Sequence, residues 1–293
     1  MPKPNAKGGR MSQRVISPEH IWIVDAFTTK PFLGNAAAVC LLDAFPEDAV
    51  MQLTALSMQL SETAFLVQTG PLSYDLRWFT PEVEVNLCGH ATLAATHVLA
   101  QMGKAQKGDT VTFSTMSGDL TATVLQNGAI ALDFPTLESD PAKPHLALAY
   151  LGVDMINVEL ARDNYLVEVK DYAALISCMP NFRKLMKMDA QGVIVTTATG
   201  IPVIGGETFD FASRYFCPVL GIDEDPVTGS AHCTLAPYWA ARLNKGTFRA
   251  FQASKGKGKL DITLKGDRTL IAGHCVTTLK GTSLTQAKDS LPC

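Results

Sequence analysis

Short apolar stretches, each bounded by Gly, Pro, Asn or Asp, follow one another along most of the chain. They predict strands, because β-branched and aromatic residues favour extended backbone and the flanking residues favour turns. Residues 46–60 instead carry apolar side chains at helical spacing after an acidic first turn, which predicts a helix. The predicted strands are 22–26, 36–42, 63–68, 73–79, 110–114, 120–125, 129–134, 164–169 and 192–197, with a further helix near 172–176. This mixture predicts an α+β fold.

Two further segments, 90–103 and 230–244, are apolar or small on nearly every helical face. A helix of this kind has to be buried, so we expect each to form the centre of its own half of the molecule. Gly89 and Gly229 allow sharp turns into these helices, and Ser230 is a residue type that caps helix starts. The first amides of a helix lack intrahelical partners, and a carboxylate ligand would satisfy them. An ordinary cap explains one such segment better, whereas two matched segments favour a binding site.

The chain also repeats one motif. An arginine, an aromatic residue, a phenylalanine, any residue and a proline begin at Arg77 and again at Arg214, close to half of the 293-residue chain later. Each copy continues through a turn-rich stretch to a glycine, a short polar residue and one of the two apolar helices. Solenoid repeats have periods of about 20–50 residues, so a single repeat at this distance indicates a duplicated half. We therefore predict two similar halves with one active site between them.

The boundaries of these halves follow from the polar segments. Residues 1–17 are charged and carry Gly and Pro, which predicts a flexible N-terminal tail, and 283–293 are expected to form a C-terminal tail. The polar, proline-containing stretch 135–144 is the best candidate for a linker. We therefore place the N-terminal half at 18–136 and the C-terminal half at 137–282. The C-terminal strand is a candidate to join the N-terminal half.

Composition narrows the class of protein. A hydrophobic fraction of 47% and a net charge of −3 fit a soluble enzyme and offer no basic stripe of the kind that nucleic-acid binding requires. The longest apolar runs are far shorter than the roughly 18 residues of a membrane span, and the N-terminus lacks the apolar core of a signal peptide. Seven cysteines, an odd number, fit reduced thiols better than a disulfide framework. We expect a cytoplasmic protein with no nucleic-acid or membrane partner.

Six motifs run in one order across most of the chain: Asp25 to Val39 with its Gly34-Asn35 step, Leu60-Ser61-Glu62-Thr63-Ala64-Phe65-Leu66, Arg77-Trp-Phe-Thr-Pro, Cys88-Gly-His90-Ala-Thr-Leu, Arg214-Tyr-Phe-Cys-Pro and Asp225-Pro226-Val-Thr228-Gly229-Ser230-Ala. Together they resemble the PhzF family of phenazine-biosynthesis-like isomerases. That family shares its fold with diaminopimelate epimerases and, more distantly, with proline racemases. The resemblance implies a homodimer and two pseudo-symmetric halves, each a curved, mostly antiparallel sheet wrapped around a central helix (diaminopimelate epimerase-like).

Glu62 is the candidate general acid/base. It falls where the helix predicted over 46–60 passes into a strand, next to Ala64 and Phe65. A carboxyl group in such surroundings is expected to be harder to ionise, which suits a group that takes and gives a proton near neutral pH. From the residue types alone, a Ser-Glu pair at a helix end is more often at the surface. The resemblance reverses this expectation, because Ser61-Glu62-Thr63 matches the family's catalytic glutamate motif.

His90, Asp225 and Ser230 match the other polar active-site positions of the family. The resemblance implies that His90, which we count with Glu62 and Asp225 as catalytic, holds a substrate oxygen or carboxylate. It implies that Asp225 accepts from a substrate amine or orients His90. A histidine at a helix start is otherwise a cap, and Asp-Pro is first of all a turn signal. The expected substrate-binding residues are Asn35, Gly89, Gly229 and Ser230.

Three functions stay open on the sequence. The first is a cofactor-independent isomerase that moves a proton on a small cyclic or amino-acid-like carboxylate. The second is an amino-acid racemase or epimerase with two thiols: Cys88 stands where one of them would be, but no cysteine directly precedes the second Gly-Ser step, and Cys233 lies a turn inside the helix. The third is a non-catalytic member of the fold that binds small acids. The sequence carries no metal cluster, dinucleotide fingerprint or phosphate-binding loop, so we expect no metal and no cofactor.

Overall fold

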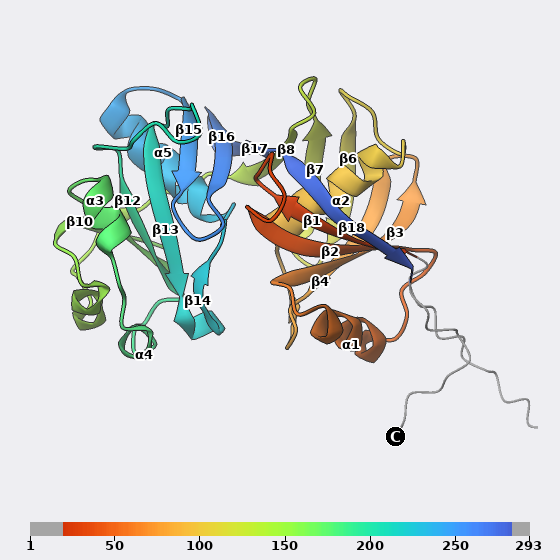
Figure 1. The fold of residues 1–293 in the computed structure, drawn as a ribbon, viewed down its shortest axis with the longest axis horizontal. Coiled ribbons are helices and arrows are strands. Elements are labelled where there is room, and N and C mark those ends of the chain that lie inside the picture. Colours follow the sequence, from red (N-terminus) through yellow and green to blue (C-terminus); the bar gives the residue numbers. More distant parts are fainter. Residues whose placement is uncertain (1–19, 283–293) are drawn as a thin grey trace, which may run out of the picture.

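The computed structural model describes residues 20–282, so the two predicted tails lie outside the described residues. Two lobes stand side by side (Figure 1). The first lobe contains β1 (His20–Ala26), β2 (Asn35–Leu42), α1 (Asp48–Met58), β3 (Glu62–Gly70), β4 (Ser73–Phe79), β5 (Glu84–Val85), α2 (Gly89–Gln101), β6 (Thr110–Thr115), β7 (Gly118–Val124) and β8 (Ile130–Pro135).

The second lobe is built from the rest of the chain except its last strand. Its elements are β9 (Asp140–Pro141), the 3-10 helix η1 (Leu146–Leu151), β10 (Met155–Ala161), β11 (Asn164–Val169), α3 (Tyr172–Ser177), α4 (Phe182–Leu185), β12 (Gly192–Thr197), β13 (Phe211–Cys217), the 3-10 helix η2 (Pro218–Leu220), β14 (Ile222–Asp225), α5 (Ala231–Leu243), β15 (Thr247–Gln252), β16 (Gly258–Lys265) and β17 (Arg268–Gly273). The last strand, β18 (Cys275–Thr282), crosses back and pairs with β1 in the first lobe (Figure 1).

The strand pairings of the two lobes repeat one another. In each lobe two parallel pairs interrupt an otherwise antiparallel sheet: β2 with β3 and β4 with β6 in the first, β11 with β12 and β13 with β15 in the second. The registers also correspond. Tyr74 pairs with Phe113 in the first lobe, and Phe211 pairs with Ala250 in the second. Each residue of the second pair follows its counterpart in the first by the same number of positions that separates Arg77 from Arg214. β8 and β17 occupy equivalent places and pair with each other, which joins the lobes in one sheet.

The repeated arginines carry the same local structure. Arg77 Nε lies 2.7 Å from Glu84 Oε1, and Arg214 Nε lies 2.7 Å from Glu224 Oε1. Each guanidinium also stacks over the phenylalanine two residues later, Phe79 or Phe216. A bidentate guanidinium–carboxylate pair ties each short strand, β5 or β14, to its neighbour. These strands lead into the turns that precede α2 and α5.

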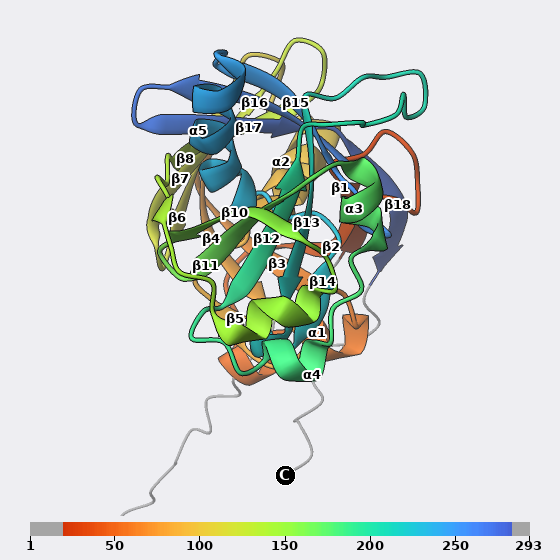
Figure 2. The ribbon, with the colours of Figure 1, turned by 90° about the vertical axis from the view of Figure 1, so that its left-hand side faces the viewer.

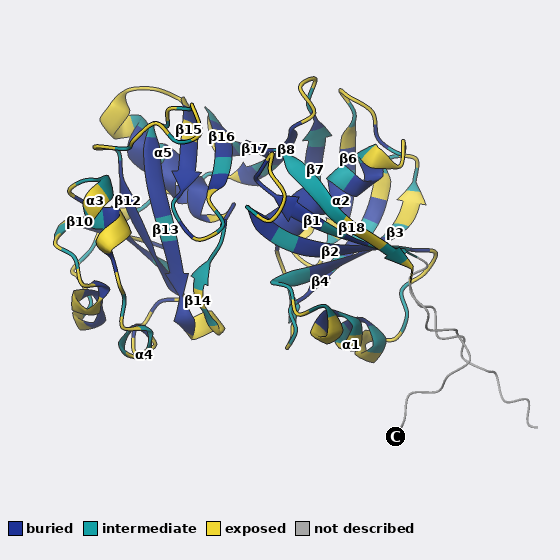
Figure 3. Cartoon of the chain, viewed as in Figure 1, coloured by how far each residue is buried: buried dark blue, intermediate teal, exposed yellow. Residues whose placement is uncertain are grey.

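The two apolar helices are the buried centres of their lobes. Nine residues of α2 and eight of α5 are buried, and α2 contacts β1, β2, β3, β7 and β8. Figure 2 shows the strands curving past both helices. In Figure 3 the buried residues gather on the strands and on α5. One core cluster includes residues of both lobes. The fold is therefore the predicted α+β fold with curved sheets. None of the helices over 20–282 is long and apolar enough to cross a membrane.

Most predicted elements form close to their expected bounds, and the stretch proposed as a linker contains one short strand that was not predicted. Within 135–144 the short strand β9 (Asp140–Pro141) pairs with β10 of the second lobe. The pattern of polar residues and prolines does not predict this strand, because an edge strand of two residues needs no alternation of apolar and polar side chains. The strands β5, β10 and β13 to β17 were also not predicted, whereas the C-terminal strand, β18, was expected without bounds.

Candidate active site

A cavity of about 250 Å³ lies between the lobes and is open to solvent. It takes lining residues from the starts of α2 and α5, from the first residue of β3 and from the ends of β13 and β14. They are Glu62, Leu87, Cys88, Gly89, His90, Asn164, Gln191, Tyr215, Cys217, Leu220, Ile222, Asp225, Val227, Thr228, Gly229 and Ser230. Every expected site residue except Asn35 therefore lines one cavity, and Asn35 contacts two of them.

Glu62 reaches this cavity because the chain changes direction twice before it. Helix α1 ends at Met58, and Gln59 takes a left-handed conformation with φ of 53°. β3 then begins at Glu62, which pairs with Ala37 of β2. The junction predicted from the sequence is present. The carboxylate is largely buried, with a side-chain exposure of 14%.

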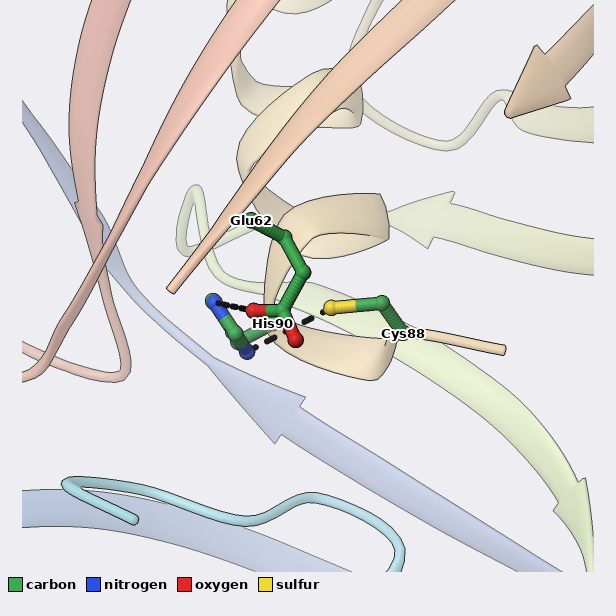
Figure 4. A group of neighbouring side chains, drawn as sticks. All are labelled: Glu62, Cys88 and His90. Atoms are coloured by element: carbon green, nitrogen blue, oxygen red, sulfur yellow. Dashed lines mark hydrogen bonds and ion pairs between the residues drawn. The ribbon is translucent and has the colours of Figure 1, made fainter. Parts of the chain in front are cut away.

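Glu62 faces His90 and Cys88, which come from the start of α2 (Figure 4). His90 Nε2 lies 3.1 Å from Glu62 Oε2, and Cys88 Sγ lies 3.5 Å from His90 Nδ1. The first contact is an ion pair without an aligned hydrogen bond, since neither atom has a hydrogen-bond partner among the described residues. One donor atom from each of the three side chains lies within 4.8 Å of the others, so these residues are also the candidate ligands for a metal ion.

The electrostatics of this pair correct one expectation. Burial favours the neutral form of Glu62, as expected from the sequence, but the positive charge of His90 at 3.1 Å, together with the polar contacts of His90 and Cys88, outweighs it. The pKa of Glu62 therefore lies below its ordinary value, and the prediction of a raised pKa is wrong. Burial likewise opposes a charge on His90, yet Cys88 and Glu62 raise the pKa of His90 well above its ordinary value. Of these two neighbours the carboxylate is the decisive one, because the Cys88 thiol is protonated, with a pKa raised to about 11.

Asn35 connects His90 with Asp225 across the two lobes. Its amide nitrogen donates to Asp225 Oδ1 at 2.9 Å and to the Val227 carbonyl at 3.1 Å, and it lies 3.3 Å from His90 Nδ1. Ser61 Oγ donates to Asn35 Oδ1 at 3.2 Å. Because both amide hydrogens have carbonyl or carboxylate acceptors, Asn35 fixes the Asp225 turn against the start of β2.

The starts of α2 and α5 approach the cavity from opposite lobes. Gly89 begins α2, and Gly229 and Ser230 directly precede α5. Ser230 is exposed, and its side chain makes no capping hydrogen bond, so the hydroxyl is available to a ligand. Two helix starts at one cavity bring two sets of free amides and two positive dipole ends to the same place. Such a place favours a carboxylate.

Gln252 is a supporting residue that was not predicted from the sequence. It is fully buried at the end of β15, where its side chain accepts from the Thr228 amide at 2.8 Å and donates to the Asp225 carbonyl at 2.9 Å. The Thr228 hydroxyl in turn donates to Asp225 Oδ2. Only the parallel pairing of β13 with β15 brings Gln252 to this turn. The only local signal for it was a glutamine directly after the apolar residues Ala250 and Phe251.

Cys217 and Tyr215 are further lining residues that were missed. Both lie on β13, inside the second copy of the repeated motif. The Tyr215 hydroxyl donates to Asn164 Oδ1 at 2.8 Å, which fixes the wall opposite Glu62 and His90. Cys217 is a second cavity thiol, from the lobe opposite Cys88.

Comparison with known proteins identifies the family of the chain. The family model of the PhzC-PhzF phenazine biosynthesis-like proteins matches residues 24–281. An uncharacterized isomerase of Halalkalibacterium halodurans is 45% identical over 264 residues, which are 89% of this chain and 96% of the relative. A PhzF-family crystal structure from Enterococcus faecalis has 40% identity and a TM-score of 0.84, covering 91% of this chain and 99% of its own. A probable proline racemase from Agrobacterium radiobacter K84 shares the fold alone, with 11% identity and a TM-score of 0.62 over 92% of this chain and 94% of its own.

The fold is that of PhzF-family structures and of epimerase-like proteins, and curated relatives are named isomerases. The chain belongs to the PhzC-PhzF family of phenazine biosynthesis-like proteins.

Proposed function

We propose that this protein moves a proton between two carbons of a small carboxylate substrate, with Glu62 as the general acid/base. The observation that carries the proposal is the Glu62–His90 ion pair in a cavity shared by two helix starts. The lowered pKa of Glu62 means that it begins as a carboxylate, the form that accepts a proton. The same low pKa makes the protonated form a ready donor, so the proton returns to a different carbon of the substrate.

The other residues have distinct roles in this proposal. The amides at Gly89 and Gly229 and the hydroxyl of Ser230 hold the substrate carboxylate. Asp225 accepts from a substrate amine or hydroxyl, and Asn35 keeps it in place. His90 holds Glu62 in its charged form and faces a substrate oxygen. No step calls for a cofactor, and we propose that none is used.

A two-thiol racemase is the second candidate, and Cys217 is the observation that favours it. Cys88 and Cys217 reach the cavity from opposite lobes, as a two-thiol mechanism requires. Racemisation by thiols needs a thiolate on one side. Burial and neighbouring carboxylates raise the pKa of both thiols, so neither is ionised near neutral pH. The carboxylate mechanism is therefore preferred to the thiol mechanism.

We also propose that the protein acts in the cytoplasm as a homodimer. The family resemblance supports the dimer, and the odd number of cysteines supports a reducing compartment. Light scattering coupled to size-exclusion chromatography tests the proposed dimer, and we expect a mass twice that of the chain. A monomer would contradict it.

A ligand screen tests the proposed function. Cyclic, aromatic and amino-acid-like carboxylates are tested for thermal stabilisation of the protein, and each ligand is then incubated with enzyme in deuterated water. We expect at least one carboxylate to stabilise the protein and to gain deuterium at carbon. If some carboxylates bind but none of them gains deuterium at carbon, the result would favour a non-catalytic acid-binding protein.

A further inference from the structure

The Glu62–Cys88–His90 cluster has the spacing of metal ligands. The closest contacts between donor atoms are 3.1 Å for His90 Nε2 to Glu62 Oε2 and 3.5 Å for His90 Nδ1 to Cys88 Sγ. With Zn–N and Zn–O bonds of about 2.0–2.1 Å and Zn–S bonds of about 2.3 Å, tetrahedral ligands stand roughly 3.3–3.6 Å apart. The two contacts involve different nitrogens of His90, so a single nitrogen serves as ligand beside both other side chains only after the ring turns; one donor atom from each of the three residues lies within 4.8 Å of the others.

Two of these donor atoms pair only with each other. Glu62 Oε2 and His90 Nε2 are buried and form the 3.1 Å ion pair, but neither makes an aligned hydrogen bond with any described residue. Buried polar atoms without an aligned hydrogen bond are uncommon, and a bound water, ion or ligand often accounts for them. The three side chains also point toward one another and not away into the lobes (Figure 4).

The cavity suits a divalent cation once His90 has lost its additional proton. The described residues that line the cavity include two carboxylates, Glu62 and Asp225, and neither lysine nor arginine. The Glu62 carboxylate and a Cys88 thiolate would together balance a divalent ion. Coordination requires a neutral imidazole and a thiolate, so the additional proton of His90 and the thiol proton of Cys88 both leave to solvent. The open side of the cavity leaves a fourth position for water, as in other zinc sites with three protein ligands.

We propose that Glu62, Cys88 and His90 form a binding site for Zn²⁺, and that zinc inhibits this protein by occupying its acid/base residue. The proposed zinc binding does not depend on which reaction the protein catalyses, whereas the proposed inhibition rests on the proposed isomerase function. Zinc takes the Glu62 oxygen that would otherwise accept the substrate proton. Zinc would therefore compete with the substrate and would not serve as a cofactor.

The test uses the full chain, stripped of metal with a chelator and then exchanged into chelator-free buffer. Zn²⁺ binding is measured by calorimetry, and Co²⁺ serves as a spectroscopic probe because thiolate coordination gives a charge-transfer band. Cys88→Ser and Glu62→Gln each remove one ligand while keeping the side-chain size. Cys275→Ser is the matched control, because Cys275 is partly exposed and lies outside the cluster.

We expect one equivalent of Zn²⁺ to bind to the wild type and to the control. Each ligand variant should lose more affinity than the roughly 10–100-fold that the loss of an outer-shell partner costs. The Co²⁺ charge-transfer band should disappear in Cys88→Ser. Wild-type protein that binds no zinc, or a Cys88→Ser variant that binds zinc and cobalt like the control, would overturn the site. Since neither readout measures turnover, failure here is distinct from failure of the isomerase proposal.

Discussion

Glu62 and His90 stabilise one another's charged forms in a site where burial alone would neutralise both. Desolvation penalises an isolated buried charge, so each of these residues depends on the other to remain ionised. A base that is already deprotonated before the substrate arrives needs no preceding proton loss. The pair therefore replaces the raised glutamate pKa that the apolar flanks of Glu62 suggested.

Asp225 has the opposite perturbation. Burial, the largest influence, raises its pKa to about 6, and the Glu62 carboxylate adds to this, although His90, Thr228 and Asn35 oppose it. In the unfolded chain the pKa is near 3.8. The folded protein therefore holds this proton more tightly than the unfolded chain, and the contribution of Asp225 to stability falls as pH rises from about 4 through about 6.

Asp225→Asn should remove this pH dependence. We expect the variant to be more stable than the wild type above pH 6, where the wild-type carboxylate is charged, and the difference to vanish near pH 4. Asparagine keeps an oxygen for the Asn35 amide and can donate to the Thr228 hydroxyl. Thermal unfolding of both proteins between pH 4 and pH 8 measures the difference. A variant whose stability relative to wild type does not change with pH would contradict the raised pKa.

The loop between β1 and β2 packs tightly against the turn between β15 and β16. The Gly34 amide donates to the Gly256 carbonyl at 2.6 Å. A Cβ atom at Gly256 would lie 2.3 Å from the Gly34 carbonyl oxygen and 2.9 Å from Pro226 Cβ. Asn35 and Asp225 directly adjoin this contact. The turn therefore sets the distance between two elements that carry site residues.

Gly256→Ala should force these elements apart. We expect a loss of about 1–3 kcal/mol in the free energy of unfolding, the usual cost of overpacking. Gly246→Ala is the matched control, since its added Cβ meets no atom within 4 Å. Urea unfolding of the two variants gives the comparison. Equal stability of the two variants would contradict this prediction, because it would show that the Gly34–Gly256 contact accommodates the added methyl group.

The elements that could be predicted from the sequence are those with a strong local pattern. The strand at 73–79 and the helices at 172–176 and 230–244 carry apolar periodicity and clear flanking signals, and they form close to their predicted bounds. β14 and β18 do not carry such a pattern, because partly exposed residues make up most of each strand. Their pairing is decided by neighbours distant in sequence, which a local pattern does not report.

The candidate site was predictable where its residues match the active-site positions of the family that the sequence resembles. Glu62, His90 and Asp225 were expected to share a cleft, and the structure places all three on one cavity. Gln252 and Cys217 were not expected there. Their positions depend on which strands pair, on the register of β13 against β15, and on the chain path after β13.

At the scale of the molecule, one strand is exchanged between the lobes. β18 follows the second lobe in sequence and pairs with β1 of the first. β8 and β17 join the lobes directly, and the main core cluster contains residues of both. Neither lobe therefore keeps its complete sheet without the other.

This exchange predicts one cooperative unfolding transition. In differential scanning calorimetry the calorimetric and van't Hoff enthalpies of the metal-free protein should agree, as they do for a two-state unit. Zinc-free conditions matter, because a ligand of the native state shifts the transition. Two resolved transitions would show that the lobes unfold independently, in spite of the shared strands.

The central claim is that Glu62 carries the proton, and solvent deuterium tests it most directly. For any carboxylate that the wild type isomerises, deuterium incorporation at carbon is followed by NMR in the wild type, Glu62→Gln and Cys88→Ser. Glutamine keeps the size of the side chain but cannot exchange a proton. The account predicts that Glu62→Gln slows incorporation by roughly 10²–10⁴-fold, the usual contribution of a general acid/base. Full exchange in Glu62→Gln together with none in Cys88→Ser would contradict the account and assign the chemistry to a thiol.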